Sequence, residues 1–530
     1  VEGLRAPMIG RDEELNRIRR RLEALVEAQQ GSFILITGEA GIGKSRLKLE
    51  VKALLSQTMV KVIEGQSLTY RRLVAYWIFM DALRNYLGVT PDTPEAQVSE
   101  KLAKSLARLP GARANETRPY LEHLLSLTPG ETAAHHIRYL DASQLRQQVF
   151  LAVRDLLLAE ARRQPLLLIL EDLHWADPTS LDLVLFLLES IRQAPIMILA
   201  TSRPLEENGL GRIAELAEER LGEGYCPILL QSLSPAQSEQ LLSQLLENSN
   251  LPPSLQEQIL QRAAGIPFYL EEILRMLIDQ GLFRKESDCW MLVSGTRLLT
   301  LSVPETLEDL ILARFDRLEE TERRILQVAS VIGRQFSLPV LAAVFKSLGK
   351  KALMAGLSNL VEREFIIPQP DPLAVEYSFR HVLTSDAIYK TLLRREQSEL
   401  HGLIGEAIEA VYANRLEGQI EILARHYSWS PRHDRALHYL ILAGQKAWRS
   451  YANEQARQHY ELALEILQKV KHLPTQALQV YSGLADVLVL AGEYAAARQH
   501  YQLALRAIIG KEPGLYAAER SALQRKIGTT

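Results

Sequence analysis

The chain has 530 residues, which is too long for a single hydrophobic core and predicts three or four domains. Its residues are 47% hydrophobic and 24% charged, as is typical of a soluble globular protein, and its formal net charge of -3 argues against broad non-specific binding of nucleic acid. Two cysteines, Cys226 and Cys289, are too few for a disulfide framework or a cysteine metal cluster, so we expect a reducing, cytoplasmic location.

The N-terminal segment, residues 1–30, holds a short lead and an amphipathic helix, "RDEELNRIRRRLEALVEAQQ", with apolar residues at helical spacing. The sequence opens on Val1 rather than on methionine, so we expect a segment of a longer polypeptide. It has no charged-then-apolar leader, and no apolar run reaches the roughly 20 residues that span a bilayer, so we expect no membrane contact.

Residues 31–234 alternate short apolar runs with helical patterns. The runs contain "FILIT", "MVKVIEGQS", "PLLLILED", "APIMILATSRP" and "CPILLQSL". Such alternation predicts a parallel sheet with crossover helices. After the last run, Ser234 fits the N-cap and Pro235 the first position of a helix that begins the next segment.

The stretch "GEAGIGKS" follows the strand "FILIT", precedes the helix "SRLKLEVKALL" and fits a phosphate loop. Its glycines Gly38, Gly41 and Gly43 let backbone N–H groups turn toward phosphates. Lys44 supplies a positive charge to the terminal phosphates, and the hydroxyl of Ser45 is a ligand for magnesium. The alternative is a purely structural glycine turn. We expect ATP or ADP with Mg²⁺ to bind here.

The strand "PLLLILED" ends in two acids, Glu171 and Asp172. Because strand residues alternate faces, one carboxylate can reach the magnesium shell while the other approaches the terminal phosphate. We assign Glu171 to the metal and Asp172 to the attacking water. Paired acids after a strand are often a solvated turn or a helix cap, but the upstream phosphate loop favours the functional interpretation.

Further residues are predicted to contact the nucleotide. Arg203 ends the next strand in "ATSRP", where it can make bidentate bonds to a terminal phosphate, the alternative being a surface ion pair. Arg46 directly follows the phosphate loop and is included in the predicted nucleotide site.

The remainder of the chain is mainly helical. Residues 235–299 show helical patterns, and residues 300–395 add a strand pair, "EFIIPQP" and "AVEYSFRH", joined by "PDP", which predicts a winged helix. Residues 396–530 contain only helix patterns, and "ARQHYELAL" at 456–464 recurs as "ARQHYQLAL" at 497–505. This repetition predicts tetratricopeptide-like helical repeats rather than two unrelated amphipathic helices.

Taken in chain order, these motifs resemble the STAND class of signal-transduction ATPases of the AAA+ superfamily, as found with class III nucleotide cyclases and in multidomain transcriptional regulators. The segments that carry the resemblance are "MIGRDEEL" at 8–15, "GEAGIGKSRL" at 38–47, "LILEDLHWADPTSLDLV" at 168–184, "ATSRP" at 200–204, "GIPFYLEEIL" at 265–274 and "YSFRHVLTSDAIYKTLL" at 377–393. The resemblance implies a multidomain α/β and α protein. Its expected domains are an N-terminal lead and helix (1–30), a P-loop NTPase core with a parallel sheet (31–234), a helical lid (235–299), a winged helix (300–395) and tetratricopeptide-like repeats (396–530).

The resemblance also implies residue roles and a cycle. Ile9 of "MIGR" is expected near the adenine, and Pro267 of "GIP" over the base. His381 of "FRH" is expected to touch the diphosphate, although a histidine between a strand and a helix is often a packing residue. Family members switch between an ADP-held closed state and an ATP-held open state that assembles, so a nucleotide-dependent homo-oligomer is expected.

The chain departs from the commonest family pattern, which has two aspartates where it has Glu171 and Asp172. Fast AAA+ motors usually place a glutamate second, and the shorter Asp172 should orient water less well. We therefore expect a signalling switch that hydrolyses ATP slowly and whose repeats sense an unknown protein or small molecule.

Four alternatives to the slow switch remain. The first two are a turnover AAA+ ATPase and the regulatory portion of a nucleotide cyclase. A third is a scaffold with an inactive ATPase, against which the intact Lys44, Ser45 and acid pair count. The fourth is a winged helix that binds DNA, which is disfavoured because residues 301–350 hold equal numbers of basic and acidic residues.

Overall fold

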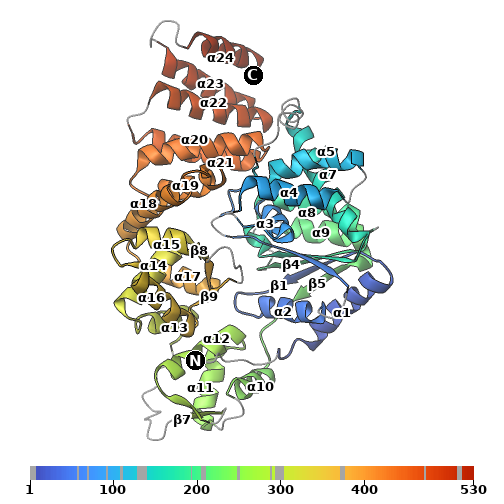
Figure 1. Cartoon of the computed structure of the whole chain (residues 1–530), viewed down its shortest axis with the longest axis vertical. Coiled ribbons are helices and arrows are strands. Elements are labelled where there is room, and N and C mark those ends of the chain that lie inside the picture. The colour runs from blue at the N-terminus through green and yellow to red at the C-terminus, as the bar shows by residue number, and fades with distance from the viewer. Residues whose placement is uncertain are drawn as a thin grey trace.

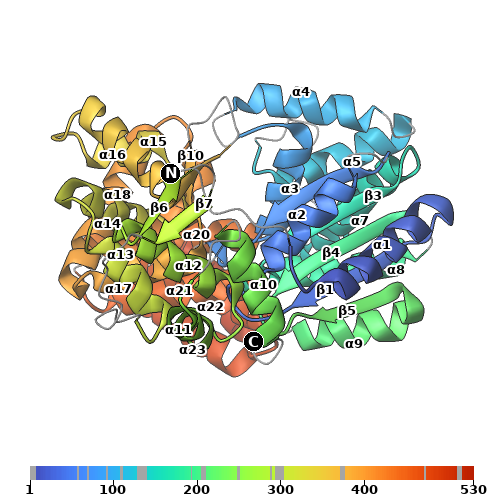
Figure 2. The same ribbon diagram turned by 90° about the horizontal axis from the view of Figure 1, so that it is seen from below.

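The structure is a computed structural model, and Figure 1 shows its arrangement. A core with a central sheet lies on one side, and a column of lid, winged helix and stacked repeats lies on the other, as Figure 2 shows from below. The described residues are 8–55, 59–68, 71–90, 93–107, 111–127, 140–192, 194–204, 210–246, 251–286, 289–292, 304–369, 376–470, 473–509 and 516–530.

The core contains a five-stranded sheet with the order β2-β3-β4-β1-β5, in which all paired neighbours are parallel. This confirms the predicted P-loop NTPase core, and each strand falls on one of the five apolar runs. The strands are β1 (Ser32–Thr37), β2 (Lys61–Gln66), β3 (Leu166–Glu171), β4 (Ile196–Ser202) and β5 (Tyr225–Leu229).

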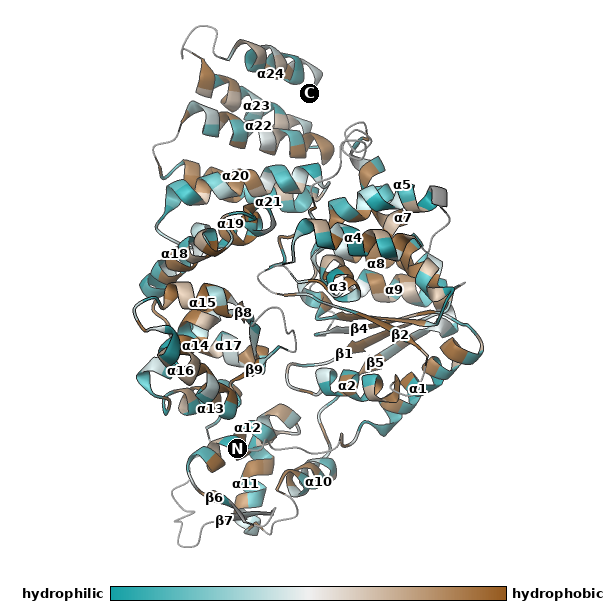
Figure 3. Cartoon of the chain, viewed as in Figure 1, coloured by the Kyte–Doolittle hydropathy of each residue, from teal (hydrophilic) through white to brown (hydrophobic). Residues whose placement is uncertain are grey.

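Helices cover both faces of this sheet, so its central strands are buried on both sides and their sequences are almost continuously apolar. Alternate residues of β1 pack differently: Ile34 and Ile36 join α1 and α2, whereas Phe33 and Leu35 join the other helices. Figure 3 shows the hydrophobic residues along β1 and β4. The helices are α1 (Asp12–Glu27), α2 (Lys44–Leu55), α3 (Trp77–Leu87), α4 (Glu95–Leu106), α5 (Gly111–Leu124), α7 (Ala142–Ala161), α8 (Pro178–Ile191) and α9 (Leu210–Leu221).

The lid follows the core. The side chain of Ser234 accepts a hydrogen bond from the backbone N–H of Gln237, and Pro235 begins α10, as predicted. The expectation of a wholly helical segment was wrong, because a short antiparallel hairpin follows α12. The elements are α10 (Pro235–Leu245), α11 (Pro253–Ala263), α12 (Pro267–Asp279), β6 (Phe283–Glu286) and β7 (Cys289–Leu292).

The next unit has the arrangement of a winged helix, with helices packed against an antiparallel sheet of order β8-β10-β9. The predicted strand pair is β9 and β10, whereas β8 was not predicted. The turn residues "PDP" lie outside the described residues. The elements are α13 (Leu307–Phe315), α14 (Glu320–Ile332), β8 (Gln335–Ser337), α15 (Leu338–Val344), α16 (Lys350–Glu362), β9 (Ile366–Pro368), β10 (Glu376–Phe379) and α17 (Val382–Thr391).

The C-terminal region is a stack of helices, which confirms the predicted helical repeats (Figure 1). The two copies of the repeated motif lie on α21 and α23, where Tyr460 and Tyr501 are both buried. None of the helices in the described part of the chain is long and apolar enough to cross a membrane. The helices are α18 (Arg394–Val411), α19 (Ile420–Ser428), α20 (His433–Arg449), α21 (Asn453–Leu467), α22 (Pro474–Leu490), α23 (Tyr494–Ile508) and α24 (Ala517–Thr529).

Candidate functional site

A cavity of ≈ 810 Å³ lies where the core, the lid and the winged helix meet. Apart from Gly38, every residue predicted for the nucleotide site lines it. Those residues are Ile9, Gly41, Gly43, Lys44, Ser45, Arg46, Glu171, Asp172, Arg203, Pro267 and His381. The fold therefore gathers the predicted set, except Gly38, from three separate parts of the chain.

The loop between β1 and α2 needs its glycines. Gly41 and Gly43 have φ angles of +81° and +109°, in the region that favours glycine. A Cβ atom on Gly41 would lie 3.0 Å from the Cβ atom of Phe268, so the lid packs directly on the loop. The backbone N–H of Phe268 also donates a hydrogen bond to the carbonyl of Gly41 (3.2 Å). A side chain at Gly41 would push the lid away.

Lys44 brings a positive charge to this loop. Its Nζ atom donates hydrogen bonds to the carbonyl oxygens of Gly38 (2.6 Å) and Glu39 (2.8 Å). Burial lowers the pKa of Lys44 to about 8, with nearby Arg203 acting in the same direction and Asp172 opposing it. Phosphate oxygens would offset this cost, and the N-terminus of α2 adds a favourable dipole. The loop therefore fits a nucleotide phosphate.

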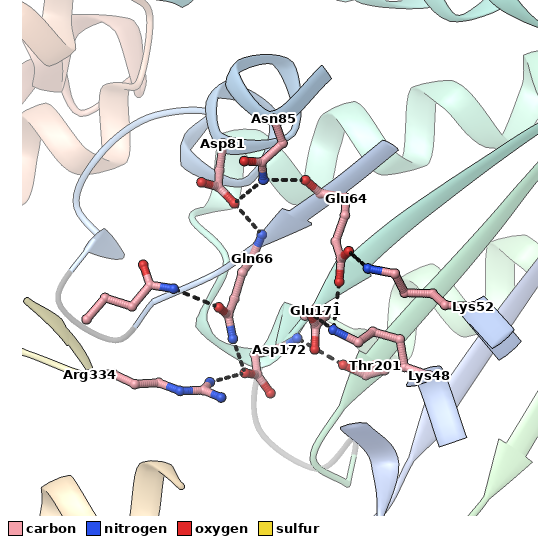
Figure 4. A network of polar contacts seen from close by, with 11 residues as sticks. Lys48, Lys52, Glu64, Gln66, Asp81, Asn85, Glu171, Asp172, Thr201 and Arg334 are labelled. Carbon is pink, nitrogen blue, oxygen red and sulfur yellow. Dashed lines mark hydrogen bonds and ion pairs between the residues drawn. The ribbon is translucent and has the colours of Figure 1, made fainter. Parts of the chain in front are cut away.

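Glu171 ends β3 and is buried in a network of charges (Figure 4). Its carboxylate accepts a hydrogen bond from Lys48 (2.7 Å), which also bonds Glu64 (2.6 Å). Burial raises the pKa of Glu171 to about 7, although the charge of Lys48 opposes the shift. In this arrangement the carboxylate predicted to serve the metal is held by a lysine of α2.

Asp172 follows in a left-handed conformation, with φ of 57°. Its backbone N–H donates to the hydroxyl of Thr201 on β4 (3.0 Å). Its carboxylate forms an ion pair with Arg334 of the winged helix (3.0 Å) and accepts a longer hydrogen bond from Gln66 (3.4 Å), as Figure 4 shows. The acid predicted to orient water is therefore engaged by an arginine from another domain.

The donor set suits a hard cation, because the hydroxyl of Ser45 and the carboxylate of Glu171 line one cavity. The described residues contain no group of three or more His, Cys, Asp or Glu side chains that could hold a metal by themselves. A magnesium ion at a phosphate loop takes its other ligands from phosphates and water, so the residues present fit such an ion.

Arg203 lies beside the aromatic residues that follow the acids. Its guanidinium is 5.6 Å from the ring centroid of Trp175, and its backbone N–H donates to Nδ1 of His174 (3.3 Å). Burial lowers the pKa of His174 to about 4, so that imidazole is neutral near pH 7. Arg203 thus lines the cavity close enough to Lys44 for its charge to affect the lysine.

Arg46 points differently from the phosphate loop. It forms an ion pair with Glu50 one turn along α2 (2.8 Å), and its side chain is 49% exposed. It lines the cavity, but its charge already has a partly buried partner, so its predicted nucleotide contact stays a prediction.

The other end of the cavity is apolar. Ile9 is buried among lid residues, and Pro267 begins α12. Arg11, which the sequence did not single out, donates to the carbonyls of Ile42 (3.3 Å) and Gln231 (2.5 Å). It fastens the N-terminal segment to the phosphate loop and so fixes the position of Ile9.

His381 caps the N-terminus of α17. Its Nδ1 atom accepts a hydrogen bond from the backbone N–H of Leu383 (3.2 Å), and its ring stacks on Phe268 of the lid (3.8 Å between centroids). Burial lowers the pKa of His381 to about 3, and the charge of Arg334 adds to the effect. A neutral ring that accepts at Nδ1 carries its proton at Nε2. His381 is therefore both a packing residue and a hydrogen-bond donor that lines the cavity.

Two contacts that the sequence did not reveal shape this site, Phe268 on His381 and Arg334 on Asp172. Arg334 follows Gly333, whose φ is 143°, between α14 and β8. The available signal in the sequence was a glycine directly before Arg334, but a glycine at that place does not identify the partner of the arginine.

Comparison with known families identifies the first part of the chain. Residues 7–199 match the family model described as an AAA ATPase domain. This part of the chain is therefore an AAA ATPase domain, a type of domain that binds nucleotide, in agreement with the predicted resemblance.

Curated relatives extend beyond this domain. An uncharacterized protein of Rhizobium meliloti is 27% identical over 491 residues, which cover 92% of this chain and 45% of the relative. Adenylate cyclase type 10 of Mus musculus is 21% identical over 462 residues, which cover 76% of this chain and 27% of the cyclase. The chain thus spans less than half the length of either relative.

Similar solved structures include a STAND protein with a tetratricopeptide repeat sensor from Pyrococcus horikoshii, at 12% identity with a TM-score of 0.42. The alignment covers 100% of this chain and 75% of that protein. Another is the ORC1 protein of Aeropyrum pernix in complex with DNA, at 14% identity with a TM-score of 0.35, covering 73% of this chain and 94% of that one.

Proposed function

Starting from the AAA ATPase domain at residues 7–199, we propose that this protein is a nucleotide-operated signalling switch of the STAND class. It binds ATP or ADP with Mg²⁺, hydrolyses ATP slowly, and opens and assembles under the control of its helical repeats. The domain limits expected from the sequence, 31–234 for the core, 235–299 for the lid, 300–395 for the winged helix and 396–530 for the repeats, belong to this proposal.

The observation that carries the proposal is the ion pair between Asp172 and Arg334 (3.0 Å). Asp172 is the residue that would orient the attacking water, and general-base action requires a free carboxylate within hydrogen-bond reach of that water. An arginine on this carboxylate occupies one of its oxygens. The closed arrangement therefore holds hydrolysis back until the winged helix moves.

The other site residues each contact a different part of the nucleotide or its metal ion. Backbone N–H groups of Gly41 and Gly43 and the ammonium of Lys44 hold the phosphates, and Arg203 supplies a second positive charge. Ser45 and Glu171 would hold Mg²⁺, which neutralises phosphate charge when bound. Ile9 and Pro267 hold the base, Arg46 contacts the nucleotide at the start of α2, and Gly38 turns the loop away from β1.

His381 would favour the closed state. Its Nε2–H donor lines the cavity only while the winged helix lies against the lid and the core. A contact made in one state and lost in another shifts the equilibrium toward the first. A donor to the diphosphate of ADP therefore stabilises the closed form.

The repeats reach the core directly. The buried side-chain amide of Gln455 on α21 donates to Asp177 (3.3 Å) and Thr179 (3.4 Å) at the start of α8. The short segment between the acid pair and α8 joins this contact to Asp172. A protein or small molecule that moves the repeats would therefore act on the acid pair, and the outcome is nucleotide-dependent assembly of copies of the chain.

The surroundings follow from the sequence. We place the switch in the cytoplasm, because two cysteines suit a reducing compartment. The proposal includes no nucleic-acid partner, because residues 301–350 of the winged-helix region hold no excess of basic residues.

The test is to replace Arg334. In Arg334→Ala the carboxylate of Asp172 is released, and single-turnover hydrolysis of ATP should become about tenfold faster or more, since one charge-assisted hydrogen bond is lost. The matched control is Arg324→Ala, an exposed arginine on α14. Hydrolysis at the parental rate in both variants would remove the proposed restraint, and the loss of hydrolysis in Arg334→Ala would assign Arg334 to the reaction itself.

The regulatory portion of a nucleotide cyclase is the second candidate, favoured by the match to adenylate cyclase type 10 over 27% of that protein. Both candidates use the same nucleotide site. A turnover ATPase differs from both, because it would release phosphate rapidly in the steady state and would not retain ADP through purification.

A further inference from the structure

A second cavity, which we call the junction cavity, lies where the core, the winged helix and the repeats meet. Its volume is ≈ 950 Å³, at the upper end of the range of small-molecule sites. Gln66 lines both this cavity and the nucleotide cavity, and its side chain touches Asp172. No residue predicted to bind nucleotide, apart from Glu171, lines the junction cavity in the described part of the chain.

One wall carries an arginine without a polar partner. Among the described residues, the guanidinium of Arg84 has no hydrogen-bond or ion-pair partner, and it lies 5.9 Å from the ring centroid of Trp77. Arg71 lies over the same ring at 4.0 Å. The nearby carboxylate of Asp81 accepts hydrogen bonds from Gln66 and Asn85 (Figure 4). Within the described chain, the guanidinium of Arg84 therefore presents positive charge that no acid pairs directly.

Burial lowers the pKa of Arg84 to about 10, and the charge of Arg71 adds to this effect. The cost of holding two guanidinium groups together is removed when an anion lies between or beside them. Arg71 also lies close enough to His426 of the repeats to lower the pKa of that imidazole. The two walls are thus within electrostatic reach of each other.

On the repeat side of the junction cavity, a lining histidine belongs to a series of side chains joined by hydrogen bonds. His426 on α19 is fully buried, and its Nδ1 atom lies 2.9 Å from Nδ1 of His401, whose Nε2 atom lies 3.2 Å from the hydroxyl of Tyr389. The Nε2 atom of His426 has no hydrogen-bond partner within the described residues. One assignment satisfies the chain: Tyr389 donates to His401, His401 donates to His426, and His426 carries a proton at Nε2.

The rest of the lining is mixed, and polar or charged side chains such as Glu64, Gln335 and Glu376 lie beside an apolar surface. The apolar surface comes from the winged helix and from the first repeat helices. The buried members are Ile332, Phe336, Val340, Ile408 and Ile422. A ligand that fills the junction cavity would therefore have an anionic group at the arginine and histidine end and an apolar body against these side chains.

We propose that the junction cavity binds a small organic anion, a phosphate or a carboxylate on an apolar body. The anionic group accepts hydrogen bonds from Arg84 and from Nε2 of His426, and Arg71 adds charge. Arg84 belongs to the core and His426 to the repeats, so such a ligand bridges the two regions. This site is separate from the nucleotide site and does not depend on ATP hydrolysis.

Titration calorimetry with three probes tests the proposal: phenyl phosphate, phenylacetate and uncharged benzyl alcohol. At least one of the two anions should bind the parent chain. The two titrations show whether the cavity accepts phosphate, carboxylate or both. Benzyl alcohol should not bind. In Arg84→Gln the affinity should fall about tenfold or more, because a charge-assisted pair is lost.

Two controls assign the site. Lys44→Ala removes the phosphate-loop cation and should leave the probe affinity unchanged, and Lys104→Gln removes an exposed charge from α4 with the same expected result. Thermal melts of each variant show whether it is folded, and Arg84→Lys, which keeps the charge, should bind more tightly than Arg84→Gln. The proposal is overturned if neither anion binds, if benzyl alcohol binds equally well, or if Lys44→Ala abolishes binding while Arg84→Gln does not.

Discussion

The winged helix meets its two neighbours through interfaces of different character. Against the lid, Arg314 and Glu272 form an ion pair (2.6 Å) whose side chains are 3% and 5% exposed. Against the core, Arg334 and Asp172 form an ion pair (3.0 Å) whose side chains are 25% and 24% exposed. Water therefore reaches the second pair but not the first.

This difference determines which interface can open. Separating the lid pair would leave buried charges without partners, and Arg275 and Glu364 extend that network between the same two domains (2.7 Å). Separating the core pair exposes two groups that are already partly hydrated, at a cost of about 1 kcal/mol or less. The lid and the winged helix should thus move together, away from the core.

The largest expected effect comes from breaking the lid interface. Arg314→Ala removes hydrogen bonds to Glu272 and Asp279 and leaves Glu272 without one of its two buried arginine partners. We expect the free energy of unfolding to fall by about 3–5 kcal/mol, as for other broken buried pairs. Urea unfolding measures this. The exposed pair of Arg395 with Glu399 is the control, and a loss below about 1 kcal/mol for Arg314→Ala would show that the lid interface is no firmer than the core interface.

A substitution of His381 tests how the closed arrangement of winged helix, lid and core affects nucleotide binding. His381→Ala should weaken ADP binding about tenfold or more, since one hydrogen bond to a charged group is lost, while ATP binding changes less. Calorimetric titration of both nucleotides into emptied protein decides this. The control His381→Asn keeps a short polar cap for α17 and separates loss of the cap from loss of the diphosphate contact. Equal losses for ADP and ATP would reduce His381 to a packing residue.

On the core side, Lys44 should make the affinity for nucleotide depend on pH. Because the pKa of Lys44 is lowered to about 8, the lysine is charged at pH 7 and mostly neutral at pH 9. Phosphate binding favours the charged form, so affinity should be constant below pH 8 and fall by up to about tenfold from pH 8 to pH 9, with proton uptake on binding. Titration in two buffers of different ionisation enthalpy measures the uptake. Lys44→Arg stays charged and should show no such fall, and an unchanged parental affinity at pH 9 would contradict the assignment.

The smallest effect is expected where the repeats touch the core. Gln455→Ala removes two long hydrogen bonds, to Asp177 and Thr179, and should cost about 1 kcal/mol of stability. It should also make opening easier, with more assembly in ATP. Gln458→Ala, on the same helix and bonded locally to Glu454, is the control. Unaltered assembly in Gln455→Ala would remove this contact from the control of the switch.

Local motifs carried most of what the sequence could predict. The phosphate loop and the acid pair are each contained in one short stretch bounded by an apolar strand, so spacing alone locates them. The hairpin β6–β7 was missed because its two strands, FRKE and CWML, have four residues each and show no alternation that separates them from a helical pattern.

Partners that lie in different domains could not be predicted. Arg334 lies 162 residues beyond Asp172 in the sequence. Arg84 and His426 come from different domains and line the same junction cavity. Each is an ordinary charged or polar residue within its own helix or loop. Their roles arise from how the domains pack, which no local pattern encodes.

Distances between domains test the central claim most directly, that the lid and the winged helix move as one body away from the core. Spin labels can be placed on exposed positions in a chain without its two cysteines: Glu219 of the core, Gln258 of the lid and Ser358 of the winged helix. Pulsed dipolar spectroscopy should give a longer Glu219–Ser358 distance with a non-hydrolysable ATP analogue than with ADP, and an unchanged Gln258–Ser358 distance. A change in the lid-to-winged-helix distance, with the core-to-winged-helix distance constant, would contradict the account.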